Sequence, residues 1–207
     1  MPKRPRPALF LLCLYILIFA YSPAAAQLDK YNYDVEEGTG FNSGTRFLLG
    51  YTVNIPNQYL GFTLGFTRPK TWGIFLDYKM DYYNLTISPY LYDYTPEYVE
   101  QYYTADTLID SYDSWATVNA GITKPISDHL CAYLGLGLSF HKAYLQYYEP
   151  YKNMGDNGYY WINDDANSAV NLNVSGGVYY KFGRYLYLQL GGEIRPLGLV
   201  AGLGLAP

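Results

Sequence analysis

The strongest constraint on the fold is an alternation of large apolar residues with small or polar ones that recurs along most of the chain. In the stretch LGFTLGFT at residues 60–67, Leu and Phe occupy every second position, with Gly and Thr between them. An alternation of period two places the two sets on opposite faces of a β-strand. The pattern recurs in eight runs, at residues 45–55, 58–67, 71–82, 114–124, 129–144, 169–182, 184–195 and 197–205. No stretch outside the N-terminus has the period of an amphipathic helix of useful length, so the sequence predicts an all-β fold.

The second face of these runs is rich in Gly, Ser, Thr, Asn and Tyr. Glycine on a face exposed to water weakens a strand, whereas glycine that faces the axis of a narrow barrel makes room for larger neighbours. Each run also has roughly the 9 to 12 residues that a tilted membrane strand needs. We therefore predict an eight-stranded antiparallel up-and-down transmembrane β-barrel, whose Leu and Phe face meets lipid. The alternative is a soluble barrel or sandwich with that face buried.

The lengths of the connections between runs support the membrane barrel. Two connections are long, at residues 83–113 and 145–168, and both fall on the same side of an up-and-down sheet. Short periplasmic turns and longer external loops are typical of outer-membrane barrels. With eight strands, both chain ends fall on the side of the short turns, where an exported chain should leave them.

The N-terminus has the organisation of a signal peptide. Three basic residues precede an apolar run at residues 8–21, which is too short to span a bilayer comfortably as a helix, and an Ala-Ala-Ala sequence follows it. We predict a signal peptide at 1–26, a periplasmic lead-in at 27–44 and the barrel at 45–207. Cleavage leaves Cys131 as the one cysteine, so no intrachain disulfide is expected.

The tyrosine content and the net charge indicate which kinds of partner the protein can have. The chain holds 27 tyrosines, while only 15% of its residues are charged, compared with about a quarter in a soluble domain. Tyrosine is enriched where one end of its ring is dry and the other wet, as at a membrane interface. The formal net charge is −4 and becomes more negative when the basic signal is removed, so nucleic acid is not an expected partner.

Several stretches together resemble the small porin-like outer-membrane β-barrel family of Gram-negative bacteria, which is eight-stranded like OmpA and OmpX. They are the signal peptide, LGFTLGFT, AYLGLGLSF (132–140), NLNVSGGVYYKFGRYLYLQLGGEIRP (171–196) and the closing GLVAGLGLAP. The resemblance implies a place in the bacterial outer membrane, contact with its lipid and with the barrel-assembly machinery, and no cofactor. Such barrels usually end with an aromatic residue that the assembly machinery reads, whereas this chain ends Leu205-Ala206-Pro207.

Six charged residues are expected to face the lumen. They are Arg46, Asp77, Lys79, Asp81, Glu193 and Arg195. An eight-stranded barrel is only wide enough for its own side chains, so we predict a network of ion pairs that fills the lumen. The alternative is a small diffusion pore with these charges as its selectivity lining.

A catalytic set is the weaker interpretation of the inward polar residues. Ser139 and His141 share the inward face of one strand, and Glu193 is also inward, which would suit acyl transfer in a lipid-modifying enzyme. Such an enzyme should aim its groups at lipid, whereas these face the lumen, so we predict no catalytic residue. No metal-ligand spacing or phosphate-binding loop is present.

The two long connections are acidic and rich in tyrosine. Rigid aromatic rings with acidic neighbours suit contact with an extracellular protein or a glycan. The predicted contact residues are Tyr90, Tyr92, Tyr94, Tyr98, Tyr147, Tyr148, Tyr159, Tyr160 and Trp161. The alternative is strand hairpins that extend above the bilayer, with tyrosines packed on one another across the strands. The predicted function is non-enzymatic, in envelope integrity or surface interaction.

Overall fold

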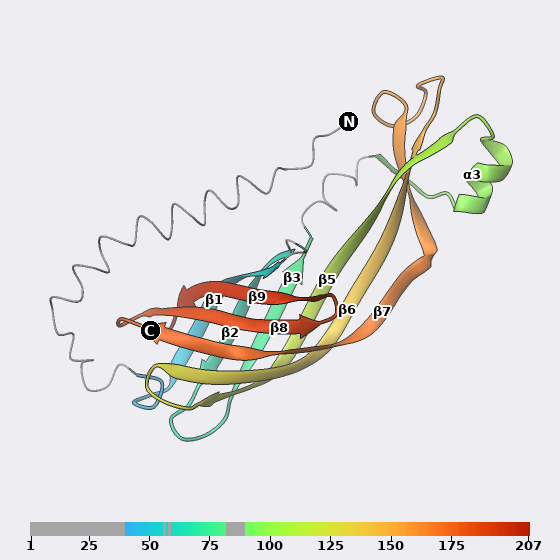
Figure 1. Cartoon of the computed structure of the whole chain (residues 1–207). Coiled ribbons are helices and arrows are strands. Elements are labelled where there is room, and N and C mark those ends of the chain that lie inside the picture. Colours follow the sequence, from blue (N-terminus) through green and yellow to red (C-terminus); the bar gives the residue numbers. More distant parts are fainter. Residues whose placement is uncertain (1–39, 56, 58, 82–89) are drawn as a thin grey trace. The chain divides into compact units, whose positions relative to one another are not determined.

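Eight antiparallel strands close into a barrel in up-and-down order (Figure 1). This computed structural model describes residues 40–55, 57, 59–81 and 90–207. The barrel closes between β1 and β9, in register from Leu49 opposite Leu205 to Ile55 opposite Leu199. The barrel strands are β1 (Arg46–Ile55), β2 (Tyr59–Thr67), β3 (Gly73–Met80), β5 (Thr107–Pro125), β6 (Leu130–Tyr148), β7 (Tyr159–Phe182), β8 (Leu186–Ile194) and β9 (Leu197–Leu205). The predicted eight-stranded all-β architecture is confirmed.

All eight strands present apolar side chains on the outside of the barrel. The most exposed include Leu136 (69%), Leu172 (80%) and Leu197 (80%), whereas the polar side chains between them point inward and are buried. An apolar belt around a polar interior is the reverse of a soluble protein, and it would be costly in water. The barrel is therefore a transmembrane one, and the soluble alternative is wrong.

The short end of the barrel includes the last part of the predicted lead-in. The predicted signal at 1–26 and residues 27–39 lie outside the described residues. Phe41 is fully buried, and its backbone N–H donates to the carbonyl of Asp128 at 2.8 Å. The end of the segment 27–44 therefore packs against the barrel, and the side chain of Phe41 fills the mouth of the lumen.

Three strands continue well beyond the barrel. The strands β5 and β6 have 19 residues each and β7 has 24, whereas the other barrel strands have 8 to 10. Pairing of β6 with β7 changes register between His141 and Ala143 and then runs out to Tyr148 opposite Tyr159. The connection predicted at 145–168 is thus mostly strand, and only residues 149–158 link β6 to β7. The sequence shows no apolar contrast there because both faces of the extension are rich in tyrosine.

The connection predicted at 83–113 also has secondary structure, within its described part from residue 90 onward. Strand β4 (Leu91–Tyr92) pairs parallel with β7, and helix α3 (Pro96–Tyr102) follows it. Thr95 caps α3 by accepting the N–H of Tyr98 at 3.3 Å, and Pro96 stands in the first turn, so TPEY is a helix start. The sequence predicted no helix of useful length in this region, and the seven-residue helix α3 was therefore not predicted. We call residues 90–113 and 144–163 the head.

Within residues 40–55, 57, 59–81 and 90–207, no helix is long and apolar enough to cross a bilayer.

Candidate functional site

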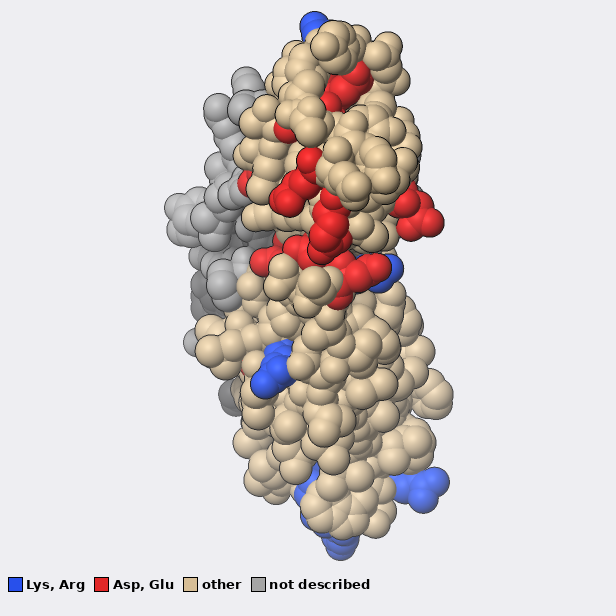
Figure 2. All heavy atoms as spheres, turned by 90° about the vertical axis from the view of Figure 1, so that its right-hand side faces the viewer, with Lys and Arg blue, Asp and Glu red and all other residues tan. Residues whose placement is uncertain are grey.

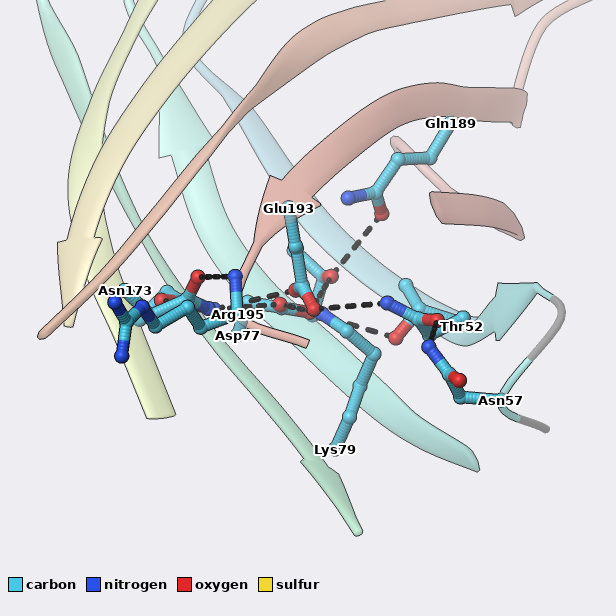
Figure 3. A network of polar contacts seen from close by, with 11 residues as sticks. Thr52, Asn57, Asp77, Lys79, Asn173, Gln189, Glu193 and Arg195 are labelled. Atoms are coloured by element: carbon cyan, nitrogen blue, oxygen red, sulfur yellow. Dashed lines mark hydrogen bonds and ion pairs between the residues drawn. The ribbon is translucent and has the colours of Figure 1, made fainter. Parts of the chain in front are cut away.

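An ion-pair network lies across the lumen in the half of the barrel nearer the head. The side chains of Asp77 and Lys79 on β3 and of Glu193 on β8 point toward one another (Figure 3). The Lys79 ammonium pairs with both carboxylates, and all three residues are at most 3% exposed. Two carboxylates share one ammonium, so neutral hydrogen-bond donors are needed to satisfy the remaining oxygens.

Amide and hydroxyl side chains supply those donors. Asn54 donates to Glu193 at 3.1 Å, and Asn119 donates to the other Glu193 oxygen at 3.3 Å. Thr63 donates to Asp77 at 2.9 Å, and Asn173 donates to Asn119 at 3.0 Å. The network therefore joins β1, β2, β3, β5, β7 and β8 across the barrel axis. Because these side chains are buried, they occupy the cross-section of the lumen at this level.

The other half of the lumen is filled by aromatic side chains. Tyr133 stacks on Tyr179 with ring centroids 4.7 Å apart, and Tyr179 meets Tyr187 edge-on at 5.3 Å. The full cluster is Phe41, Leu48, Phe75, Cys131, Tyr133, Tyr179, Tyr187 and Ala206. A polar layer and an aromatic layer together fill the lumen.

Glycines make room for these rings, as the sequence predicted for the inward face. A Cβ on Gly50 would lie 2.1 Å from the Tyr187 hydroxyl, and one on Gly191 would lie 2.1 Å from the Tyr133 hydroxyl. Gly192, the next residue on β8, faces outward, and its nearest contact would be an ordinary 3.5 Å. The inward glycines are therefore part of the packing.

The remaining predicted lumen charges lie elsewhere. Asp81 accepts a hydrogen bond from the Tyr112 hydroxyl at the head end of β3. Arg46 lies at the opposite end, where its Nε donates to the carbonyl of Gly40 at 3.4 Å. The Arg195 guanidinium is exposed and donates to Asn171 at 2.6 Å, and only its backbone N–H enters the network, to Asn173 at 3.0 Å. The structure thus brings together three of the six, and it adds the neutral Asn and Thr partners that the charge pattern could not indicate.

The residues of the catalytic alternative are not assembled. The Nε2 of His141 lies 2.9 Å from Asp113, and its ring stacks on Trp115 at 4.3 Å. Ser139 Oγ has no hydrogen-bond partner among the described residues, and Glu193 is engaged with Lys79. In the described part of the chain, no group of three His, Cys, Asp or Glu residues could hold a metal ion.

The head has an aromatic core of its own. Val99 of α3 packs with Tyr147, Tyr160 and Ile162, and Tyr92, Tyr94, Tyr103, Leu145 and Met154 surround them. The Tyr160 hydroxyl donates to Asp106 at 2.6 Å. Burial, with this hydrogen bond and the Asp106 charge adding to it, raises the pKa of Tyr160 above its usual range. A hydrogen bond with Tyr94 and partial desolvation raise the pKa of Tyr103 to about 12.

This core changes the set of predicted contact residues. Tyr147, Tyr160 and Trp161 are buried, so they build the head and are not available to a partner. Tyr148 packs on Tyr159 across the strands at 4.9 Å, as in the alternative of extended hairpins. Tyr92 and Tyr94 are partly buried, whereas Tyr90 and Tyr98 are exposed.

Sequence reasoning missed Tyr102, which is 63% exposed beside Tyr98. The two rings lie 4.7 Å apart, one helical turn from each other on α3. The helix start at TPEY, followed by tyrosines four residues apart, was the signal that could have found this pair.

The comparisons with known proteins give similarity to solved small barrels. No protein-family model matches the chain, and no curated protein sequence matches it. Ail, the attachment invasion locus protein of Yersinia pestis, is 14% identical, with 78% of this chain and 91% of that chain covered and a TM-score of 0.40. The N-terminal β-barrel domain of Pseudomonas aeruginosa OprF is 11% identical, with 78% and 94% covered and a TM-score of 0.37. Neisserial surface protein A is 14% identical, with 78% and 90% covered and a TM-score of 0.31.

Charge is distributed unevenly along the barrel axis. Residues 90–113 contain six acidic residues and no lysine or arginine. Figure 2 shows acidic side chains gathered toward the end that carries the head, while lysine and arginine side chains lie at the opposite end, beside the acidic group and at the tip of the head. The turns at that opposite end hold Arg68, Lys70 and Arg184, and Lys124 lies at the end of β5 there. The arrangement offers an acidic, aromatic surface beyond one end of a closed barrel.

Proposed function

We propose that the protein is a non-enzymatic barrel of the bacterial outer membrane that holds its head outside the cell for surface interaction. Export would use the signal peptide at 1–26, and the barrel would meet outer-membrane lipid and the barrel-assembly machinery. The observation that carries the proposal is the continuation of β5, β6 and β7 beyond the barrel into a head with its own aromatic core. A barrel that served only to cross the membrane would not need this structured extension.

The filled lumen supports this choice over a diffusion pore. Both layers of the lumen consist of buried side chains, and the central ion pairs would be costly to open because separating them leaves charges unpaired. The barrel would then anchor the protein in the membrane, and the head would make the contact. Extracellular protein is the class of partner that a rigid aromatic surface suits best.

The orientation is tested by labelling single cysteines on intact cells with a membrane-impermeant thiol reagent. Tyr102→Cys lies in the head and Lys70→Cys in a turn at the opposite end, both in a Cys131→Ala background. We expect labelling of the first variant on intact cells, and of the second only after the outer membrane is opened. The reverse pattern would refute the external head.

The function is tested in a strain that lacks the protein and is complemented with the full chain or with Tyr98→Ser/Tyr102→Ser. Adhesion to host or matrix surfaces should be lost in the deletion strain and remain low with the double variant. Detergent resistance of the cells measures envelope integrity in parallel. If detergent resistance falls while adhesion is unchanged, the protein serves envelope integrity and the proposal is wrong.

A further inference from the structure

Five tyrosines of the head form a row of stacked and tilted rings that we call the tyrosine ladder: Tyr92, Tyr94, Tyr98, Tyr102 and Tyr103. Ring centroids are 5.9 Å apart from Tyr92 to Tyr94, 5.2 Å from Tyr94 to Tyr98 and 4.7 Å from Tyr98 to Tyr102. Tyr103 closes against Tyr94 at 5.7 Å. The ladder runs from partly buried rings at the core of the head to exposed rings on α3, with Tyr98 at 42% and Tyr102 at 63% exposure.

The exposed rings of Tyr98 and Tyr102 are held in place by the packing of α3 on the core of the head. Val99 lies between Tyr98 and Tyr102 in sequence, is buried, and packs into the core with Tyr147, Tyr160 and Ile162. The Thr95 cap and Pro96 fix the start of the helix. Rings that are already ordered lose little conformational entropy when a partner binds, so their apolar surface contributes more fully to affinity.

The negative charge around the ladder favours a positively charged partner. Asp93, Glu97 and Glu100 are exposed, and no ion pair joins them to a lysine or arginine within the described residues. In a helix, Glu97 lies on the side opposite the buried Val99, next to the flank that carries Tyr98. Polyanions such as sulfated glycans would be repelled by this surface, and so would the head of a second copy.

We propose that the tyrosine ladder and its carboxylates bind a basic, arginine-rich segment of a polypeptide. This inference rests on the proposed function, which places the head outside the cell. The guanidinium group is planar, stacks on aromatic faces and pairs with carboxylates through two hydrogen bonds. A polypeptide fits better than a small cation because the carboxylates are spread over α3 and the loop that joins β4 to it. Several cations on one chain would engage them together.

The test measures binding of fluorescent peptides to the full protein in lipid nanodiscs by anisotropy. The probes are an oligo-arginine peptide, an oligo-lysine peptide of equal charge and an oligo-glutamate peptide, with heparin as a polyanion. We expect the arginine peptide to bind severalfold more tightly than the lysine peptide, and its affinity to fall as salt is raised. Neither the glutamate peptide nor heparin should bind.

Two variants and a matched control separate aromatic stacking from charge. Tyr98→Ser/Tyr102→Ser should weaken binding of the arginine peptide about tenfold and remove its advantage over lysine. Glu97→Gln/Glu100→Gln should weaken both basic peptides and leave the rings in place. Tyr151→Ser is the control, because Tyr151 is 75% exposed in the head but outside the ladder, and it should bind like the parent. Circular dichroism and the heat-dependent gel shift check that each variant is folded.

Three results would overturn the proposal. The first is that arginine and lysine peptides bind with equal affinity and that Tyr98→Ser/Tyr102→Ser leaves both affinities unchanged. The second is that heparin binds more tightly than the basic peptides. The third is that neither basic peptide binds. The labelling of Tyr102→Cys on intact cells distinguishes these failures from failure of the proposed function. If the head is labelled and adhesion depends on it, only the class of partner is wrong. If the head is not accessible on cells, both proposals fail.

Discussion

At the scale of single residues, the lumen depends on a small number of side chains with matched partners. Lys79 is the one cation between Asp77 and Glu193 in the described network, and glycines leave the space that Tyr133 and Tyr187 occupy. A buried ion pair contributes little net stability compared with an apolar core, but removal of one partner is costly because a buried charge is left alone. We therefore expect substitutions in the lumen to lower the stability of the barrel strongly, although none of these side chains is exposed.

The first prediction concerns the central cation. Lys79→Met should lower the free energy of unfolding by about 3 kcal/mol or more, because Asp77 and Glu193 lose their shared counter-ion. Urea unfolding in lipid vesicles, followed by tryptophan fluorescence, measures the change. Lys142→Met, at an exposed position on the same barrel, serves as the control and should be nearly neutral. Equal stability of the two variants would show that the network does not hold the lumen together.

The second prediction concerns packing inside the barrel. Gly191→Ala should destabilise the protein by about 1 to 3 kcal/mol, because the added methyl group meets the Tyr133 hydroxyl and the backbone of Gly176. Gly192→Ala, one residue further on the outward face, should be within about 0.5 kcal/mol of the parent. The same urea titration compares them. A larger loss for Gly192→Ala would mean that β8 faces the other way.

At the scale of elements, the barrel and the head are held together by different contacts. The barrel is closed by strand pairing on every side, whereas the head depends on an aromatic core of tyrosines and on α3. Tyrosines that are buried near carboxylates resist ionisation, so the head carries a built-in sensitivity to alkali.

The third prediction follows from these tyrosines. Their folded-state pKa values are raised, so the stability that they contribute is fully present below about pH 10, the ordinary tyrosine value, and is lost as pH rises toward 12. Ultraviolet absorbance of tyrosinate and circular dichroism should show the head opening in this range. Tyr160→Phe should shift the opening to higher pH, at a cost of about 1 kcal/mol near neutrality for the lost hydrogen bond to Asp106. An unchanged midpoint would contradict this.

The sequence predicts the elements inside the bilayer better than those outside it. Lipid requires an apolar residue at every outward position, so strands such as β2 and β9 could be assigned from alternation alone. In the head, water and tyrosine lie on both sides of the strands, so the extension of β6 to Tyr148 leaves no such pattern. The start of α3 was visible as a cap at Thr95, but a helix of seven residues is too short for periodicity to show.

In the candidate site, too, the sequence predicts contacts within one strand better than contacts between distant strands. Asp77 and Lys79 are two residues apart on one strand, so their common inward face could be predicted. Whether Glu193 reaches them depends on strand register across the closed barrel, which the sequence does not encode locally. Burial of Tyr160 likewise depends on α3 folding back onto β7, a contact between distant segments.

At the scale of the whole molecule, the barrel is closed and its lumen is filled by side chains. The fourth prediction is that the refolded protein shows no steady ohmic current steps in a planar bilayer, because polar and aromatic layers fill the lumen. A shift between unboiled and boiled samples on a gel confirms that the barrel in that preparation is closed. Steady current steps from a gel-shifted sample would contradict the filled lumen and favour the diffusion pore.

The continuous pairing of β5 with β6 across the rim has a mechanical consequence, whereas β7 changes register with β6 there, between His141 and Ala143. The segment of β5 from Thr107 to Trp115 measures roughly 26 Å along the strand, at about 3.3 Å per residue, and from Asp110 onward it pairs with β6 without a change of register. A sideways pull on the head would be transmitted through β5 and β6 as torque on the barrel, so that the barrel tilts in the bilayer as the head turns. Lipid viscosity, rather than the slack of a tether, would set how quickly the head reorients under load.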